Sequence, residues 1–303
     1  MNKTNVFKRI LRDYELYLFL LPTLVFFGIF AYGPMYGIQI AFKDYNGALG
    51  YAGSPWVGLK HIKNFLDSFF FWQIIKNTVI LSLYSILAGF PIPILLALML
   101  NEVKNPKYKK LVQTVTYAPY FISTVVLVGI ILIFLSPSTG MVNNVLKSMG
   151  LEPVYFMSKS YYFRHIYVWT GIWQSAGWGS IIYLAALAAV DMEQHEAATI
   201  DGASRLQRIW HINIPTILPT TVILFILNAG AVMNVGFEKV YLMQNSLNLE
   251  TSEVIATYIY KRGLINADFS FSSAVGLFNN VINFLLLMFV NFIARRLGET
   301  SLF

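Results

Sequence analysis

The chain has 303 residues, of which 56% are hydrophobic and only 12% are charged, and its mean hydropathy is +0.59. Soluble domains carry about a quarter charged residues, so this composition excludes an ordinary soluble protein and indicates a protein of the lipid bilayer. The net charge of +7 is divided between segments expected on opposite sides of the membrane, which favours contact with anionic lipid over nucleic-acid binding. The absence of cysteine excludes disulfides, cysteine metal sites and thiol nucleophiles.

Six long stretches of the sequence contain no Asp, Glu, Lys or Arg, and each can supply the ~20 apolar residues that a spanning helix needs. We therefore expect an all-α, polytopic membrane protein with six transmembrane helices in one domain, 1–303. The first stretch is too long for a signal-peptide core, so we expect it to be an uncleaved span. The expected spans are 16–40, 77–101, 114–135, 166–190, 217–237 and 272–294.

Basic residues are dense in the short segments before the first span, between the second and third, between the fourth and fifth, and after the sixth. These segments hold 12 of the 22 Lys and Arg residues, and the first of them includes Lys3, Lys8 and Arg9. The other 10 are spread over much longer segments. The positive-inside rule therefore places both termini in the cytoplasm.

Three polar segments are expected outside: 44–76, 136–164 and 238–268. In the last, the run TSEVIATYIYKRGL has the apolar spacing of a short amphipathic helix. Glu238 and Lys239 begin this segment, and we interpret them as an interfacial ion pair of little energetic value. The alternative is a docking surface for an external binding protein.

The fourth expected span carries Gly171, Ser175 and Gly179 at intervals of four residues. Small residues at this spacing form a face that lets another helix approach closely. We therefore interpret this face as a packing surface.

The cytoplasmic segment 191–215 reads DMEQHEAATIDGASRLQRIWHINIP. Asp191 can cap the start of a helix, and Gln194 stands at the reciprocal position of a capping box. The helix is expected to continue to about Asp201, where Gly202 supplies the left-handed residue that closes it.

A second helix is predicted to begin directly after this turn. Ser204 and Gln207 form another capping-box pattern, and Pro215 is expected to end the helix by restricting Ile214. The product is a helix–Gly–helix hairpin on the cytoplasmic surface. The pattern alone is equally compatible with a hairpin resting on the membrane interface and with one that docks a partner.

This segment resembles the EAA loop of permease subunits of bacterial ABC importers. The resemblance rests on Glu196-Ala197-Ala198, on Asp201-Gly202-Ala203, and on Ile212, Pro215 and Pro219. In that family the loop forms a coupling helix that sits in a cleft of the ATPase subunit. The resemblance thus implies an ATPase-coupling role for Glu196, Ala197, Ala198, Asp201, Gly202, Ala203, Trp210 and Pro215.

The likeness extends over nearly the whole chain. Runs such as LLPTLVFFGIFAYGPMYGIQIAFKDYN and GWGSIIYLAALAAVD are similar to sugar-type importer permeases, closest to the branch for rhamnogalacturonan- or alginate-derived fragments. This implies the type I ABC importer permease fold, in the bacterial plasma membrane. It also implies a heterodimer with a second homologous permease, two ATPase subunits and an extracellular solute-binding protein.

The chain contains no Gly-x-x-x-x-Gly-Lys-Ser/Thr motif, so we expect ATP and Mg to be bound by the partner ATPase and no cofactor by this chain. We also expect neither catalytic residues nor a metal site. A secondary carrier or channel would need ionisable residues in mid-span, and a membrane enzyme would need a convergent catalytic set. These alternatives, and a permease for another solute, remain alongside the main hypothesis.

Sugar sites use aromatic faces for the pyranose ring and amides for hydroxyls. Candidates for the substrate path are Trp173, Ser175, Trp178, Asn228 and Asn234. The resemblance to maltose-type permeases places Ser175, Trp178 and Asn234 at or near their sugar-lining positions. The alternatives are lipid-facing anchors for the tryptophans and an interhelical hydrogen bond for Asn234.

The sequence leaves the charge of the sugar open. Five basic residues expected outside would favour an acidic saccharide: Lys147, Lys159, Arg164, Lys261 and Arg262. Four nearby acidic residues dilute that signal: Glu152, Glu250, Glu253 and Asp268.

Overall fold

The computed structural model describes residue 12 and residues 14–296. Most of the basic N-terminal segment, including Lys3, Lys8 and Arg9, and residues 297–303 lie outside the described part, as do the chain ends predicted to be cytoplasmic. One isolated antiparallel bridge joins Lys43 and Trp56, and the remaining regular structure of the described residues is helical. This confirms the prediction of an all-α protein.

Four helical segments of the described chain are long and apolar enough to cross a membrane: Tyr14–Phe42, Phe71–Asn101, Arg205–Gly230 and Phe269–Arg296. Two further pairs of helices are long and apolar enough only when each pair is taken together, and both pairs are bent. Pro106–Phe121 and Thr124–Phe134 meet at 99°, and Ser160–Leu187 and Met192–Ile200 meet at 78°. Within the described part there are thus four such helices, or six if each bent pair counts as one span.

The chain divides into two compact units, of which the first comprises the residues up to Leu66 together with Arg262–Leu277. Its long helical segment consists of α2 (Tyr14–Phe26), the π-helix η1 (Phe27–Tyr32), α3 (Gly33–Met35) and the 3₁₀-helix η2 (Tyr36–Phe42). Pro34 has no N–H to donate, and the wide turn of η1 precedes it. No residue of α2 is buried in this chain, as suits a helix whose neighbours are lipid or another subunit.

A loop follows η2 in the first unit. This loop contains α4 (Gly50–Gly53) and leads to α5 (Lys60–Leu66). The Lys60 ammonium lies 2.7 Å from the Asp44 carboxylate, and this hydrogen bond holds the pKa of Asp44 below its ordinary value. The Phe65 ring meets the edge of the Phe271 ring at 6.2 Å, which joins α5 to the start of the last helix.

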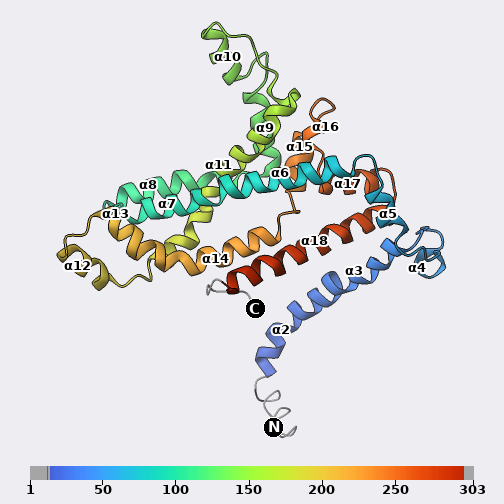
Figure 1. Ribbon diagram of the computed structural model, residues 1–303, viewed down its shortest axis with the longest axis horizontal. Helices are drawn as coiled ribbons and strands as arrows, with labels where there is room; N and C mark the ends of the chain where they lie inside the picture. The colour runs from blue at the N-terminus through green and yellow to red at the C-terminus, as the bar shows by residue number, and fades with distance from the viewer. Residues whose placement is uncertain (1–11, 13, 297–303) are drawn as a thin grey trace. The chain divides into compact units, whose positions relative to one another are not determined.

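The second unit comprises Asp67–Lys261 and the residues from Phe278 onward. Helix α11 (Ser160–Leu187) lies at its centre and packs against four other long helices (Figure 1). These are α6 (Phe71–Gly89), α7 (Pro91–Asn101), α8 (Pro106–Tyr117) and α14 (Ile214–Gly230). The last helix, α18 (Phe269–Arg296), begins in the first unit and continues into the second.

Shorter elements complete the second unit. Between α8 and α11 lie η3 (Ala118–Phe121), α9 (Thr124–Phe134), α10 (Met141–Ser148) and η4 (Phe156–Ser158). After α11 come α12 (Met192–Ile200), α13 (Arg205–Arg208) and the π-helix η5 (Ile209–Asn213). After α14 come α15 (Phe237–Met243), α16 (Leu249–Ser252), α17 (Ile255–Tyr260) and the π-helix η6 (Lys261–Ile265), which crosses into the first unit.

Two apolar clusters form the core of this unit. One joins α6, α9, α11 and α15 through buried residues that include Leu81, Val128, Phe163 and Val240. The other joins α7, α11 and α14 through Ala97, Leu98, Tyr183, Leu187 and Ile217. Because α11 contributes to both clusters, its position fixes the helices on either side of it.

A neighbouring helix approaches α11 closely at Gly177, a residue that the predicted small-residue face did not include. A Cβ atom at Gly177 would lie 2.0 Å from the backbone oxygen of Thr116 in α8. Of the predicted face, Gly179 does meet a neighbouring helix, since a Cβ there would lie 3.3 Å from the Pro93 ring. Gly171 and Ser175 also line a cleft, and a Cβ at Gly171 would lie 3.2 Å from the Lys239 ammonium of α15.

The chain bends sharply between η3 and α9, inside the stretch 114–135 that we predicted as one span. Pro119 interrupts the helical hydrogen bonding, Ile122 is extended, and Ser123 caps α9 by accepting from the Val126 N–H. The backbone carbonyl of Ile122 accepts a hydrogen bond of 2.8 Å from the Gln174 side chain of α11. The bend is therefore stabilised by a side chain 52 positions away in the sequence.

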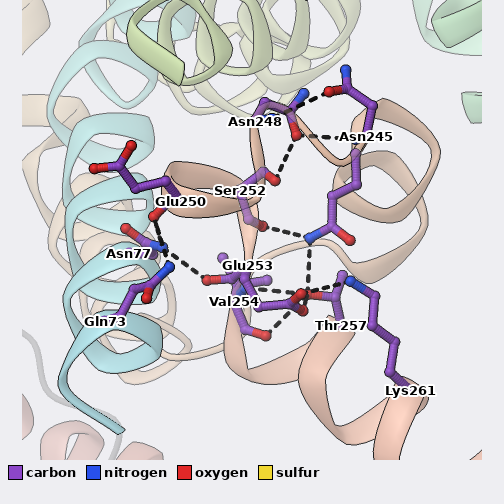
Figure 2. A network of polar contacts seen from close by, with 11 residues as sticks. Gln73, Asn77, Asn245, Asn248, Glu250, Ser252, Glu253, Val254, Thr257 and Lys261 are labelled. Carbon is purple, nitrogen blue, oxygen red and sulfur yellow. Dashed lines mark hydrogen bonds and ion pairs between the residues drawn. The ribbon is translucent and has the colours of Figure 1, made fainter. Parts of the chain in front are cut away.

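A polar network fixes the segment that follows α15 (Figure 2). The Asn77 amide, from α6, donates to the backbone oxygens of Glu250 and Glu253 at 2.8 and 3.0 Å. Its oxygen accepts from Arg164 of α11 at 2.8 Å. Asn248 is fully buried and donates to the backbone oxygen of Met157 at 2.9 Å. The amphipathic spacing predicted for this segment corresponds to α17, which begins two residues after Glu253.

Candidate functional site

The first candidate site is the hairpin, residues 191–215. Asp191 caps α12 by accepting from the N–H of Glu193 at 3.0 Å, so the predicted capping box with Gln194 does not form. Gly202 has φ +80°, and the N–H of Ala203 returns to the carbonyl of Ala198 at 2.8 Å. These are the features of a glycine helix end, as the sequence predicted.

The second arm of the hairpin begins with a complete capping box. The Ser204 N–H donates to Gln207 Oε1 at 2.7 Å, and the Gln207 N–H donates back to Ser204 Oγ. The prediction that Pro215 ends this arm was wrong, because Ile214 keeps helical angles and α14 continues through the proline. The reason lies in η5, whose wider turn spans the residues just before Pro215, where the proline ring would otherwise meet the preceding turn.

The hairpin presents an apolar surface to its surroundings. Ile200 is 87% exposed, Leu206 77% and Trp210 69%. Glu196, Ala197, Asp201, Gly202 and Pro215 are also exposed, whereas Ala198 and Ala203 are partly buried between the two arms. Arg208 of the second arm hydrogen bonds to Thr199 of the first, which holds the arms together. A projecting, capped hairpin with large exposed apolar side chains is suited to insertion into a partner.

The second candidate site is a cleft of about 600 Å³ in the second unit. Its wall is formed by one face of α11 together with parts of α6, α7, η3, α14 and α15. Three of the five predicted path residues line it: Ser175, Trp178 and Asn228. Ser175 and Asn228 donate to carbonyls of their own helices at 2.8 and 2.7 Å, which leaves their oxygens as acceptors toward the cleft.

An aromatic platform forms one side of the cleft. The rings of Tyr120 and Trp178 are stacked at 4.6 Å and lie within 4° of parallel, and the edge of Phe121 supports the Trp178 ring at 5.6 Å. Both Tyr120 and Trp178 remain more than a third exposed, so part of the platform is open. Flat aromatic faces beside amide and hydroxyl groups are a chemistry suited to a sugar ring.

The other two predicted path residues lie elsewhere. Trp173 is exposed and does not line the cleft. Asn234, in the turn between α14 and α15, accepts hydrogen bonds from the amides of Asn279 and Asn283 of α18 at 2.9 and 3.0 Å. Its contacts are those of the alternative interpretation, an interhelical hydrogen bond.

Lys239 is a cleft residue that the sequence analysis assigned wrongly. Glu238 is exposed, whereas Lys239 is only 9% exposed, and no ion pair joins the two in the described structure. The Lys239 ammonium donates to the backbone oxygen of Tyr167 at 2.9 Å and lies 4.9 Å from the centre of the Tyr167 ring. Burial lowers the pKa of Lys239 to about 8.

A family model described as "Binding-protein-dependent transport system inner membrane component" matches residues 89–299. This range is more than half of the chain and contains both the hairpin and the residues that form most of the cleft. The chain belongs to this family. It is a permease component of an ABC transport system in the inner membrane, which confirms the resemblance found in the sequence.

The relatives of this permease extend the match to nearly its full length. Protein LplB of Bacillus subtilis (strain 168) is 44% identical over 96% of this chain and 92% of its own length. The polygalacturonan/rhamnogalacturonan transport system permease protein YteP of the same organism is 42% identical over 97% of this chain and 92% of its own. The name of YteP is consistent with the sugar-type resemblance of the sequence.

Solved structures agree with these relatives. The permease is similar to a chain of a bacterial ABC transporter involved in the import of the acidic polysaccharide alginate, with a TM-score of 0.90 and 44% identity. That match covers 97% of this permease and 100% of the other chain. A chain of a bacterial alginate ABC transporter in complex with an alginate pentasaccharide-bound periplasmic protein matches with a TM-score of 0.89 and 44% identity, over 97% of this permease and 99% of the other chain.

Sequence reasoning missed Tyr120, Gln174 and Lys239 as residues of the cleft. Tyr120 follows Pro119 at the bend, and its approach to Trp178 depends on that bend. Gln174 precedes Ser175 on α11. It could have been predicted as a cleft residue, since it is the one amide side chain in the predicted span 166–190. Lys239 had a charged neighbour in the sequence, which suggested the wrong partner.

Proposed function

We propose that this permease moves an oligosaccharide, a breakdown product of an acidic polysaccharide, across the bacterial plasma membrane by ATP-driven alternating access. The observation that carries the proposal is the likeness over 97% of the chain to a chain of the alginate importer, at 44% identity and a TM-score of 0.90. The similarity to YteP, a permease protein of a polygalacturonan/rhamnogalacturonan transport system, supports the same substrate class.

In this proposal the chain crosses the membrane six times, near 16–40, 77–101, 114–135, 166–190, 217–237 and 272–294, with both termini in the cytoplasm. The two bent pairs then have different meanings. The 99° bend near Ile122 lies within the third span. The 78° bend lies where the fourth span gives way to α12 and so marks the start of the coupling hairpin, 191–215.

The permease works with other chains: a second homologous permease, two ATPase subunits and an extracellular solute-binding protein. The periplasmic protein bound to the alginate transporter supports the last of these. ATP and Mg bind to the ATPase subunits, and this chain contributes no catalytic residue.

The hairpin receives the movement of the ATPase through Glu196, Ala197, Ala198, Asp201, Gly202, Ala203, Trp210 and Pro215. Its exposed apolar residues support this role, because Ile200, Leu206 and Trp210 lack a partner surface within the described chain.

The cleft holds the sugar during its passage. The open faces of Tyr120 and Trp178 pack against a sugar ring, and Gln174, Ser175 and Asn228 meet its hydroxyl groups. Trp173 and Asn234 were predicted for the same path, but both lie outside the cleft lining, and we assign them no contact with the sugar.

Reconstitution tests this proposal. The permease is incorporated into proteoliposomes with its partner permease and ATPase subunits, and the solute-binding protein is added with a labelled oligouronate. We expect uptake that needs both ATP and the binding protein. Uptake driven by an ion gradient without ATP, or no uptake of any oligosaccharide, would overturn it.

A further inference from the structure

Lys239 is the one charged residue among the described residues that line the cleft. Its neighbours on the cleft wall are aromatic, aliphatic, amide or hydroxyl side chains. A lone ammonium ion in such a wall needs a reason, because removing a cation from water is costly unless an anion compensates it.

Structural support of α11 does not supply that reason. The acceptor of Lys239, the backbone oxygen of Tyr167, lies inside α11, where the helix already provides a donor for it. A Cβ atom at Gly171, one turn further on, would lie 3.2 Å from the ammonium nitrogen. The absence of a side chain at Gly171 therefore leaves the space that the ammonium group occupies beside the cleft.

The ammonium group also has unused capacity. It carries three N–H donors, and the described structure uses one of them, toward Tyr167. Donors that face a cleft and carry a positive charge are matched by an anion with oxygen acceptors. The carboxylate of a uronic acid is such a group, and it is ionised at neutral pH as other carboxylic acids are.

We propose that Lys239 is a specificity-determining residue of the transport path, which pairs with a carboxylate of an acidic sugar held in the cleft. This inference rests on the proposed function and deepens it by naming the group that distinguishes acidic from neutral substrates. The platform of Tyr120 and Trp178 binds the sugar ring whatever its charge. Lys239 adds attraction for the carboxylate alone, in a site where water screens the charges weakly.

The test compares two substrates in the reconstituted importer: an oligouronate and the same oligosaccharide with its carboxyl groups reduced to alcohols. Lys239→Met removes the charge and keeps most of the side-chain length, and Lys239→Arg keeps the charge. We expect Lys239→Met to lower the rate of oligouronate uptake at limiting concentration by about tenfold or more, as the loss of one partner of a desolvated ion pair does. Uptake of the reduced oligosaccharide should change far less, and Lys239→Arg should retain most of the preference.

Lys159→Met is the matched control, because Lys159 is exposed and lies outside the cleft lining. An equal loss for both substrates in Lys239→Met would mean that the lysine is structural, and unchanged oligouronate uptake would also overturn the proposal. If Lys239→Met does not accumulate in the membrane, Lys239→Gln gives the same comparison with a polar side chain. Failure of the wild-type importer to take up either sugar would instead contradict the proposed function.

Discussion

Gly177 of α11 and Thr116 of α8 pack backbone against backbone, so that a Cβ atom on Gly177 would lie 2.0 Å from the Thr116 carbonyl oxygen. Neither helix can relieve such a contact by rotating a side chain. Helix α8 can therefore lie this close to α11 only because residue 177 has no side chain.

Gly177→Ala should destabilise the permease by at least about 2 kcal/mol, because the added methyl group forces two helix backbones apart. The measurement is thermal unfolding of the purified protein in detergent. Gly129→Ala is the control, since no atom lies within 4 Å of the corresponding Cβ position. Equal unfolding temperatures for the two variants would show that α8 and α11 separate easily.

Gly202→Trp should reduce ATP-driven uptake strongly while the permease still reaches the membrane. There are two reasons. The backbone at position 202 has φ +80°, a conformation that is strained for a residue with an ordinary side chain. The indole would also project from the surface that meets the ATPase. Uptake and ATPase co-purification are measured together. Gly202→Asn is the control, because asparagine tolerates the left-handed conformation. This variant should keep most of the uptake and should still co-purify with the ATPase. Wild-type uptake by Gly202→Trp would contradict the coupling role.

Trp178→Ala should lower oligosaccharide uptake by about tenfold, because it removes one of the two stacked rings of the platform. Trp178→Phe retains an aromatic face and should lose less. Uptake is measured at limiting substrate, with the amount of permease in the membrane determined for each variant. Unchanged uptake in Trp178→Ala would exclude the platform from the path.

Asn234→Ala should act mainly on stability, by about 1–3 kcal/mol, because it leaves the buried amides of Asn279 and Asn283 without their shared acceptor. Thermal unfolding provides the measurement. Asn234→Asp preserves an acceptor oxygen at the same place and should lose less. A variant that unfolds normally but fails to transport would instead return Asn234 to the substrate path.

Asn77→Leu should loosen the segment around α16, because Asn77 bonds to the backbone oxygens of Glu250 and Glu253 (Figure 2). Faster hydrogen exchange of the amides in 249–257 is the expected result. Gln73→Leu removes a single, longer bond of 3.2 Å to Glu250 and should have a smaller effect. The opposite order of effects would contradict the assignment.

Local signals in the sequence predicted what depends on neighbouring residues. Gly202 ends α12, and Ser204 with Gln207 begins α13, because these conformations are determined within a few positions of the chain. The apolar stretches predicted helices for the same reason. The cleft residues Ser175, Trp178 and Asn228 were found because sugar sites use hydroxyl, aromatic and amide groups.

The remaining features depend on contacts that sequence order does not reveal. The bend at Ile122 is completed by Gln174, 52 positions away. The pairing expected for Glu238 and Lys239 fails because adjacent residues of a helix point in different directions, and Lys239 finds its acceptor on α11 instead. Pro215 did not end its helix, because the wider turn of η5 leaves room for the proline ring that a regular helical turn would not.

The bonds of Asn77 also have a consequence for the order in which the permease is built. Its two carbonyl partners lie 173 and 176 positions later in the chain, and translation reaches them only after most of the protein has been synthesised. A chain interrupted before Glu250 would leave this buried amide with neither acceptor, at the cost that an unsatisfied polar group carries. The network thus forms only after Glu253 has been synthesised, and a chain that ends earlier lacks it.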